Sequence, residues 1–220
     1  MRFSGLIFDF DGVLLESEYV GNKQIADYLT AIGHPISVEE ALAEFMGLSG
    51  PTFTDAIERW LGQSLPSGFH AAREEEDARV LREGIAAVAG AVEFVESLAP
   101  DLPRAIASSS SLDWIRAHLD HLGIRGCFEP HIYSGKVHVS RGKPAPDLYL
   151  HAAAALGVRI ERIAIIEDSP VGVAGAVASG AFVIGLAAGS HCSSGHAERL
   201  LKLGAQASAK SFEEVAAILA

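Results

Sequence analysis

Short apolar runs alternate with amphipathic stretches in two parts of the chain, residues 1–15 and 86–220. The runs are residues 5–8, 104–107, 132–133, 163–166 and 182–186, and the amphipathic stretches are 91–99, 112–121, 146–156, 170–179 and 211–219. Strands that alternate with helices at these lengths predict an α/β fold, with a Rossmann-like parallel sheet core and helices on both faces. In sheets of this type, ligands bind at the carboxyl ends of the strands.

The segment between these two parts has a different pattern. In residues 16–85 the apolar positions recur at helical spacing, and no strand-like run interrupts them. Turn-forming residues break the segment at 33–35, 47–51 and 65–68. We therefore expect an inserted α-helical domain at 16–85, within a sheet domain made of residues 1–15 and 86–220.

Composition narrows the class of protein. The chain has 220 residues, a hydrophobic content of 49% and a formal net charge of −11. This acidic balance argues against nucleic acids and anionic membranes as partners, and no apolar run approaches the roughly 20 residues of a membrane span. Two cysteines are too few for a disulfide framework, so we expect reduced thiols and a cytoplasmic protein.

Two carboxylates, Asp9 and Asp11, follow the first apolar run and precede Gly12. Close carboxylates repel each other unless a cation or a shared proton relieves the repulsion. Gly12 allows a sharp turn and the close approach of a ligand. A solvated pair of acids in a loop is the alternative, but the position at the end of a buried strand favours a functional site.

A second pair of acids, Glu167 and Asp168, ends the apolar run at 163–166. If the two strand ends are neighbours, Asp9, Asp11 and Asp168 surround one point with oxygen ligands, which suit Mg²⁺. The alternative is that Glu167 and Asp168 only interact with the N-terminus of the helix that follows them.

Lys143 and the serines at 108–111 offer groups that can bind an anion. Prolines restrain the backbone after Lys143, whose ammonium can neutralise a phosphate or a carboxylate. Ser108 stands at a strand end before a helix, where a hydroxyl can bind an oxyanion. The alternatives are an exposed loop lysine and, for Ser110 and Ser111, N-capping of the following helix, which we prefer for these two serines.

In order and spacing, these features resemble the four sequence motifs of the haloacid dehalogenase superfamily. They stand here as Asp-x-Asp-Gly-Val-Leu at 9–14, Ser108, Lys-Pro-Ala-Pro-Asp at 143–147 and Glu-Asp-Ser-x-x-Gly at 167–172. The resemblance covers nearly the whole chain and looks closest to the branch with a helical cap inserted after the first motif. That branch includes phosphoglycolate phosphatase, sugar-phosphate phosphatases and beta-phosphoglucomutase, and the resemblance implies that residues 16–85 are the cap domain.

The resemblance implies a Mg²⁺-dependent phosphatase that hydrolyses a small phosphate monoester, such as a sugar phosphate, through an aspartyl-phosphate intermediate. Asp9 is then the nucleophile, and Asp11 is the general acid and later the base. Ser108 and Lys143 hold the phosphoryl oxygens, which fits a reaction that needs mainly alignment and charge neutralisation.

The resemblance also implies a set of binding residues. The implied metal-binding residues are Asp9, Asp11 through its backbone carbonyl, Asp168 and Glu167, the last as a ligand or as the neighbour of a ligand. The implied substrate-binding residues are Ser108, Ser109 and Lys143 of the core and, by their place in the cap, Gly47 and Ser49.

Other functions stay open as alternatives. A beta-phosphoglucomutase-like sugar phosphomutase uses a cap histidine and a cap arginine, and Gly21 and Gly50 stand at those positions here. A receiver-like phosphoacceptor signalling module also combines acids, Mg²⁺ and lysine, but its acceptor ends an interior strand of a shorter chain. A haloacid dehalogenase proper lacks the second aspartate of the first motif, so Asp11 argues against it.

His191, Cys192 and His196 raise the question of a zinc site. They stand in a Gly/Ser-rich segment without a second cysteine pair, so we interpret them as loop residues that bind no metal. The expected partner is a small phosphorylated metabolite rather than nucleic acid or membrane, and the expected state is a monomer or a weak homo-oligomer.

Overall fold

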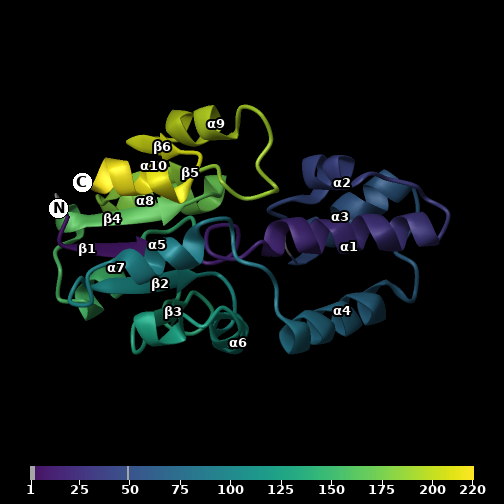
Figure 1. The fold of residues 1–220 in the computed structure, drawn as a ribbon. Helices are drawn as coiled ribbons and strands as arrows, with labels where there is room; N and C mark the ends of the chain where they lie inside the picture. Colours follow the sequence, from purple (N-terminus) through teal and green to yellow (C-terminus); the bar gives the residue numbers. More distant parts are fainter. Residues whose placement is uncertain (1–2, 49) are drawn as a thin grey trace. The chain divides into compact units, whose positions relative to one another are not determined.

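The structure is a computed structural model that describes residues 3–48 and 50–220. The chain divides into two compact units, Met1–Glu16 with Ala86–Ala220 and Ser17–Ile85. The first unit contains the sheet and the helices that cover it, and the second is helical (Figure 1). We refer to them as the sheet unit and the helical unit.

The sheet has six parallel strands in the order β3–β2–β1–β4–β5–β6 (Figure 1). The strands are β1 Gly5–Phe8, β2 Arg104–Ser108, β3 Ile132–Ser134, β4 Ile163–Glu167, β5 Phe182–Leu186 and β6 Ala207–Ala209. The strand order reverses at β1, because β2 pairs with one side of it and β4 with the other. The crevice at such a reversal is where open parallel sheets bind ligands.

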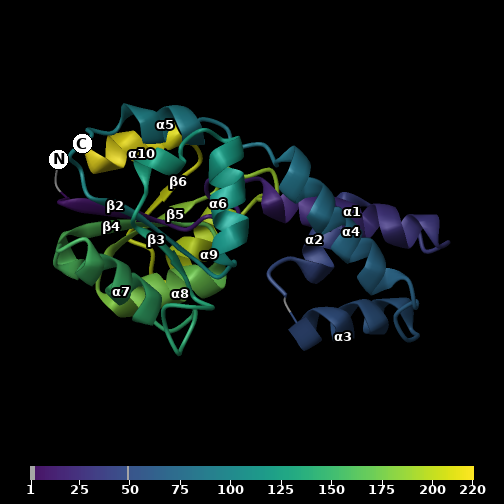
Figure 2. The same ribbon diagram turned by 90° about the horizontal axis from the view of Figure 1, so that it is seen from below.

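Helices cover both faces of the sheet (Figure 2). They are α5 Ala91–Ser97, α6 Leu112–His121, α7 Asp147–Ala155, α8 Pro170–Ser179, α9 His196–Lys202 and α10 Phe212–Leu219. On one face, Phe94 of α5 packs against Phe8 and Phe212 with ring centroids 6.1 and 5.1 Å apart. On the other, Ile7 and Ile165 pack in one core cluster with residues of α7 and α8. Neighbouring residues of β1 thus point to opposite faces, as strand geometry requires.

The helical unit has a core of its own. Its helices are α1 Ser17–Ala31, α2 Val38–Phe45, α3 Gly50–Leu61 and α4 Phe69–Glu83. Phe45 of α2 packs edge-on against Phe53 and Trp60 of α3, with ring centroids 6.5 and 6.3 Å apart. The Ser37 side chain accepts from the Glu40 backbone amide and the Glu40 side chain accepts from that of Ser37, which forms a capping box at the start of α2.

The predicted fold class is confirmed, and several elements begin and end where the sequence indicates. Helix α6 begins after Ser111, whose side chain accepts from the Trp114 amide, and α8 begins at Pro170 after the N-cap Ser169. Helix α9 and strand β6 were not predicted. The three residues of β6 are Ala-Ser-Ala, which have no strand pattern of their own and pair only with β5.

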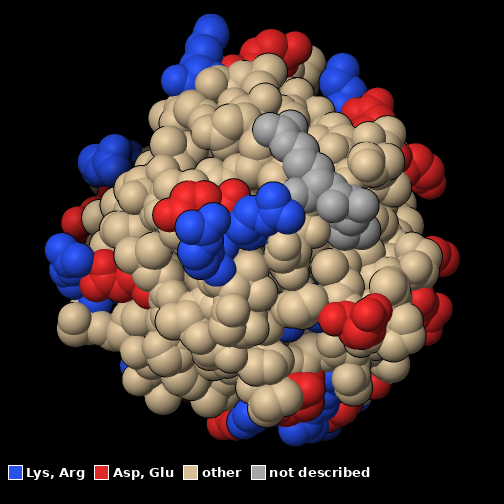
Figure 3. Space-filling view, turned by 90° about the vertical axis from the view of Figure 1, so that its left-hand side faces the viewer, with Lys and Arg blue, Asp and Glu red and all other residues tan. Residues whose placement is uncertain are grey.

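Within residues 3–48 and 50–220, no helix is both long and apolar enough to cross a membrane. Figure 3 shows one face of the molecule, on which basic side chains near the centre and around the margin are interspersed with acidic ones. The described part of that face therefore presents no continuous basic surface.

Candidate active site

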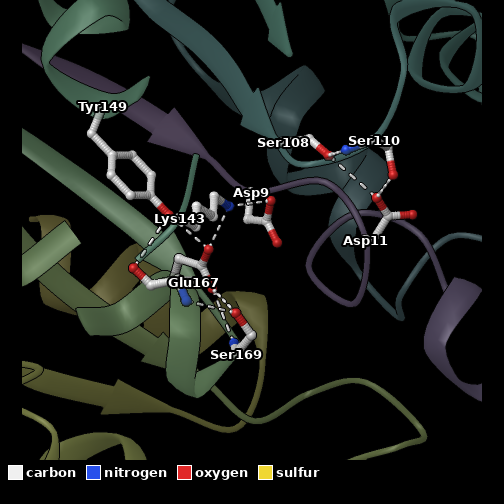
Figure 4. Close-up of polar contacts among 9 residues, drawn as sticks. Asp9, Asp11, Ser108, Ser110, Lys143, Tyr149, Glu167 and Ser169 are labelled. Carbon is white, nitrogen blue, oxygen red and sulfur yellow. Dashed lines mark hydrogen bonds and ion pairs between the residues drawn. The ribbon is translucent and has the colours of Figure 1, made fainter. Parts of the chain in front are cut away.

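The candidate site lies at the carboxyl ends of β1, β2 and β4. Phe8 of β1 pairs with Ile106 of β2 and Ile166 of β4, so residues just beyond these positions emerge at one edge of the sheet. Figure 4 shows the side chains of Asp9, Ser108 and Glu167 at this edge. The register of three strands thus brings together residues that are more than 150 positions apart in the sequence.

Asp9, Glu167 and Asp168 form a buried acidic cluster whose carboxylate oxygens lie within 4.8 Å of one another. Burial raises the pKa of Asp9 well above its ordinary value, and the negative charge of Glu167 raises it further. Crowded carboxylate oxygens of this kind can bind a divalent cation, which relieves their mutual repulsion.

Gly12 makes room for this cluster. Its φ is +79°, and a Cβ atom at this position would lie 2.1 Å from Oδ2 of Asp168. Any other residue would push the Asp168 carboxylate away from the site, so the turn after β1 requires glycine for both its backbone conformation and its lack of a side chain.

Lys143 joins two of the three acids. Its Nζ donates to Oδ1 of Asp9 and to Oε1 of Glu167, each at 2.6 Å, and only 5% of its side chain is exposed. Burial works to lower the pKa of Lys143, but the charges of Asp9 and Glu167 outweigh it, so the pKa lies well above the ordinary value. Lys143 therefore carries a positive charge within the acidic cluster at any physiological pH.

Tyr149 of α7 is a member of the site that the sequence did not reveal. Its hydroxyl donates to Oε1 of Glu167 at 2.7 Å, while the backbone amide and hydroxyl of Ser169 both donate to Oε2 at 3.0 Å (Figure 4). Glu167 is thus held by Lys143, Tyr149 and Ser169. In the sequence, Tyr149 has the spacing of a helix core residue, so no local signal distinguished it.

Gly172 allows α8 to pass close to Glu167. A Cβ atom built at this glycine would lie 1.7 Å from Oε1 of Glu167. The glycine of the Glu-Asp-Ser-x-x-Gly motif is therefore explained by this contact rather than by an unusual backbone angle.

Asp11 has a separate set of partners, from the end of β2, the loop that follows it and α6. Ser110 donates to its Oδ2 at 2.7 Å and Ser108 at 3.3 Å, and Nε1 of Trp114 donates to its Oδ1 at 3.0 Å. Trp114 in turn packs against the buried His118, with ring centroids 4.3 Å apart. Burial lowers the pKa of His118, so this ring is neutral at physiological pH.

The sequence predicts that Ser110 or Ser111 caps α6, and the structure confirms this for Ser111. Ser110, the other candidate for the cap, donates to Asp11 instead. Ser108 is buried, and Ser109 is exposed just beyond β2. In the helical unit, Gly47 follows α2 with φ of +74°, and the predicted residue Ser49 lies outside the described residues.

His191, Cys192 and His196 gather beside Asp168. Nε2 of His191 lies 2.8 Å from Oδ2 of Asp168, and Nε2 of His196 lies 2.7 Å from its backbone oxygen. Sγ of Cys192 lies 3.3 Å from Nε2 of His191. The interpretation as loop residues is confirmed for His191 and Cys192, which precede α9, and is wrong for His196, which is the first residue of α9. Both histidines are buried, with exposed fractions of 4% and 5%.

The segment that carries these residues is held by Glu16, which follows the turn after β1. The backbone amide of Ser190 donates to both oxygens of the Glu16 carboxylate, at 3.1 and 3.0 Å, and its hydroxyl donates to one of them at 3.1 Å. Burial and the charge of Asp168 raise the pKa of the Cys192 thiol to about 12. Cys192 is thus a neutral thiol at physiological pH in the absence of a cation.

Known proteins are similar to this chain in sequence and in fold. The family model of haloacid dehalogenase-like hydrolases matches residues 3–180. Hexitol phosphatase A of Escherichia coli is 31% identical over 187 residues, which cover 84% of this chain and 83% of that protein. Fructose-1-phosphate phosphatase YqaB of the same organism is 31% identical over 185 residues, covering 81% of this chain and 94% of that protein.

A solved structure of this family is also similar to the chain. A haloacid dehalogenase family hydrolase from Deinococcus radiodurans, crystallised with bound phosphate and sodium, superimposes with a TM-score of 0.86 at 32% identity. The superposition covers 99% of this chain and 95% of that one. The family match includes Asp9, Ser108, Lys143 and Asp168. Since both the sequence and the fold match over most of the chain, the protein belongs to the haloacid dehalogenase-like hydrolase family.

Proposed function

We propose that this hydrolase is a Mg²⁺-dependent phosphatase that acts on a small sugar phosphate or related metabolite through a phosphorylated Asp9. The observation that carries the proposal is the buried contact of Lys143 with Asp9 inside the acidic cluster. This arrangement holds a carboxylate nucleophile next to positive charge, which phosphoryl transfer requires. The phosphatase names of the relatives support a phosphorylated sugar or sugar alcohol as the class of substrate.

In the proposed reaction Lys143 occupies Oδ1 of Asp9, so Oδ2 is the oxygen that attacks phosphorus. The bond from phosphorus to the ester oxygen breaks, and Asp11 gives its proton to the leaving alcohol. Water then attacks the phosphorus of the aspartyl-phosphate and gives a proton to Asp11, which releases phosphate and restores both acids. Ser108 and Lys143 stabilise the negative oxygens of the phosphoryl group.

Asp9, Asp168 and the backbone carbonyl of Asp11 would hold Mg²⁺ in this proposal, and the oxygen donors of the acidic cluster fit it. When bound, Mg²⁺ neutralises charge on the carboxylates and on the phosphoryl oxygens. Glu167 serves to orient Lys143 rather than to bind the metal directly, because Lys143, Tyr149 and Ser169 already donate to its two oxygens. We also propose that the helical unit is the cap domain and that Gly47 and Ser49 contribute to substrate binding.

A phosphate-release screen tests the function. The panel contains hexose phosphates, hexitol phosphates, phosphogluconate and phosphoglycolate, each with Mg²⁺ and after removal of metal by a chelator. We expect release from at least one sugar or sugar-alcohol phosphate, its loss on chelation and its return with Mg²⁺. Mg²⁺ should also raise Tm, because it binds only the folded cluster. Release that persists without any divalent metal would contradict the proposal.

Trp114→Phe tests the position of the general acid. The phenyl ring keeps the packing against His118 but loses the indole donor to Asp11. A hydrogen bond to a charged group is worth about 1.5–3 kcal/mol, so kcat for an alkyl phosphate should fall about 10-fold or more. An aryl phosphate should be affected much less, because its leaving group needs little protonation.

The matched control is Trp60→Phe, the same change at the other tryptophan of the chain. It should leave the ratio of alkyl to aryl phosphate turnover at the value of the unmodified protein. An equal loss on both substrates in Trp114→Phe would mean that Trp114 acts on the fold alone.

A further inference from the structure

We propose that His191, Cys192 and His196, together with Asp168, form a second cation site that binds a soft divalent metal of the Zn²⁺ class. The ligand atoms of the two histidines and the cysteine lie within 4.8 Å of one another. Asp168 closes the group, since its Oδ2 lies 2.8 Å from Nε2 of His191. Two imidazoles, one sulfur and one carboxylate make a complete four-coordinate set for zinc.

The distances are close to those of a bound zinc ion. In a tetrahedral site with the usual Zn–S and Zn–N lengths, the sulfur and nitrogen ligands are about 3.6 Å apart, and Sγ of Cys192 lies 3.3 Å from Nε2 of His191. The two imidazole rings have centroids 5.8 Å apart and stand nearly perpendicular, at 87°. The sulfur and nitrogen of Cys192 and His191 thus already lie near the separation of two zinc ligands, and a ligand atom of His196 lies within 4.8 Å of both.

The backbone around the cluster is built to hold these side chains. Gly189 is required beside His191, because a Cβ atom there would lie 2.5 Å from Cε1 of the imidazole. The backbone amide of Cys192 donates to the Gly189 oxygen at 2.9 Å, which closes a turn, and Ser190 is tied to Glu16. Both histidines are buried, so their orientation is set by packing before any metal binds.

The donor types separate this site from the one proposed for Mg²⁺. Imidazole and thiolate are ligands of zinc-like cations, whereas carboxylate and carbonyl oxygens suit magnesium. The acidic cluster offers oxygens alone, and the second group offers nitrogen and sulfur with one oxygen. The thiol proton leaves to solvent when the sulfur binds the metal, so the bound group carries the charge of a thiolate.

Asp168 belongs to both groups, so the two cations compete for its carboxylate. The effect of this competition on turnover rests on the proposed phosphatase function. A zinc-class ion that takes the Asp168 carboxylate withdraws a ligand from Mg²⁺ and lowers turnover. By linkage, Mg²⁺ weakens zinc binding by the same factor that zinc weakens Mg²⁺ binding. The protein is therefore inhibited by soft metals in a way that excess Mg²⁺ opposes.

The binding test uses the whole metal-free chain, without substrate. Zn²⁺ affinity is measured by competition with a chromophoric chelator, and Co²⁺ serves as a spectroscopic probe because cysteine thiolate ligation gives a near-ultraviolet charge-transfer band. We expect one Zn²⁺ per chain and the thiolate band with Co²⁺. Cys192→Ser should abolish the band and weaken Zn²⁺ binding by about 100-fold or more, since even outer-shell changes cost 10–100-fold.

Cys127→Ser is the matched control, because Cys127 is the other cysteine and is also half-buried. It should keep the band and the affinity. Cys192→Ala is a second variant, with no oxygen that could replace the sulfur. Equal Zn²⁺ affinity in the unmodified chain, Cys192→Ser and Cys192→Ala would overturn the proposal and place the ion on the acidic cluster alone.

The activity test follows the same variants. Zn²⁺ should inhibit phosphate release by the unmodified chain and by Cys127→Ser, and the inhibition should be at least about 10-fold weaker in Cys192→Ser. Cys192 lies outside the proposed catalytic groups, so Cys192→Ser should retain its activity with Mg²⁺ alone. A chain that binds zinc through Cys192 but hydrolyses no phosphate ester would support the metal site and contradict the phosphatase.

Discussion

Asp9→Asn is expected to abolish both the phosphoenzyme and phosphate release, whereas Asp11→Asn should still form the phosphoenzyme with an aryl phosphate. An amide at position 9 is a poor nucleophile, and it removes a charge from the acidic cluster and from the contact with Lys143. Loss of a nucleophile in a covalent mechanism typically lowers turnover by more than about 10⁴-fold. Turnover of Asp9→Asn should therefore fall to the background rate.

Asp11→Asn removes the proton donor and acceptor while the nucleophile Asp9 stays in place. Its single amide oxygen can accept from Ser110 or from Trp114 but not from both, because these donate to different oxygens of Asp11. The backbone carbonyl proposed as a metal ligand is unchanged. General acid–base catalysis typically accelerates a reaction by about 10²–10⁴-fold. An aryl phosphate should phosphorylate Asp9 in this variant, and the aspartyl-phosphate should accumulate because the attacking water has no base.

Rapid quench followed by mass analysis of the peptide that carries Asp9 measures this difference. Asp113→Asn is the matched control, because Asp113 is an exposed aspartate in the first turn of α6, and it should behave like the unmodified protein. Phosphate found on Asp11 or Asp168, or no covalent species with any good substrate, would show that the roles are assigned wrongly.

Lys143→Met is expected to lower kcat by about 10²–10³-fold, the loss typical of one preorganised electrostatic group at a developing charge. Methionine keeps the length of the side chain but leaves Asp9 and Glu167 buried without their common cation. Removing one partner of a buried ion pair costs about 3–5 kcal/mol, so the free energy of unfolding should also decrease. Mg²⁺ should recover part of that stability and little of the activity.

The stability difference between Lys143→Met and the unmodified protein should depend on pH in a defined direction. Lys143 lowers the pKa of Asp9, which burial holds above its ordinary value of 3.8. Its removal raises the folded-state pKa of Asp9 further, while the unfolded-state value stays unchanged. A carboxyl group whose pKa is raised in the folded state contributes less to the stability of the fold as pH increases through that range. In metal-free buffer, the difference in free energy of unfolding between Lys143→Met and the unmodified protein should therefore be smaller in acid than at neutral pH.

Denaturant unfolding at several pH values, with and without Mg²⁺, measures this trend. Lys136→Ala is the control, because Lys136 is exposed in the same β3–α7 connection. It should change neither kcat nor the pH trend. A constant stability difference across pH would mean that Lys143 does not set the ionisation of Asp9.

Local pattern was sufficient for much of the fold. The apolar runs at 5–8 and 182–186 become β1 and β5 without a change of bounds, because strands buried on both faces need uninterrupted apolar sequence. Helix α8 begins where Ser169 and Pro170 predict it. Strand β6 could not be predicted in this way, since its stability comes from pairing with β5 and not from its own three residues.

Local sequence pattern likewise identified only part of the candidate site. Asp9, Lys143 and Glu167 stand in recognisable motifs, so the sequence alone identified them as candidates, and the structure places them in direct contact. Tyr149 and Trp114 each carry a hydrogen bond to a site carboxylate. Neither could be predicted, because an aromatic residue in a helix has the same pattern whether it fills a core or reaches a polar partner.

The cluster of His191, Cys192 and His196 depends most completely on tertiary structure. Its residues have no metal-binding spacing in the sequence, and the turn at Gly189, the tie to Glu16 and the start of α9 bring them together beside Asp168. The sequence by itself thus determined the sheet except for β6, its helices except for α9, and the acids at the strand ends, which follow from short-range hydrophobic period and turn chemistry. Only the packing of distant segments decided which side chains meet at those acids, because such contacts depend on register and loop path.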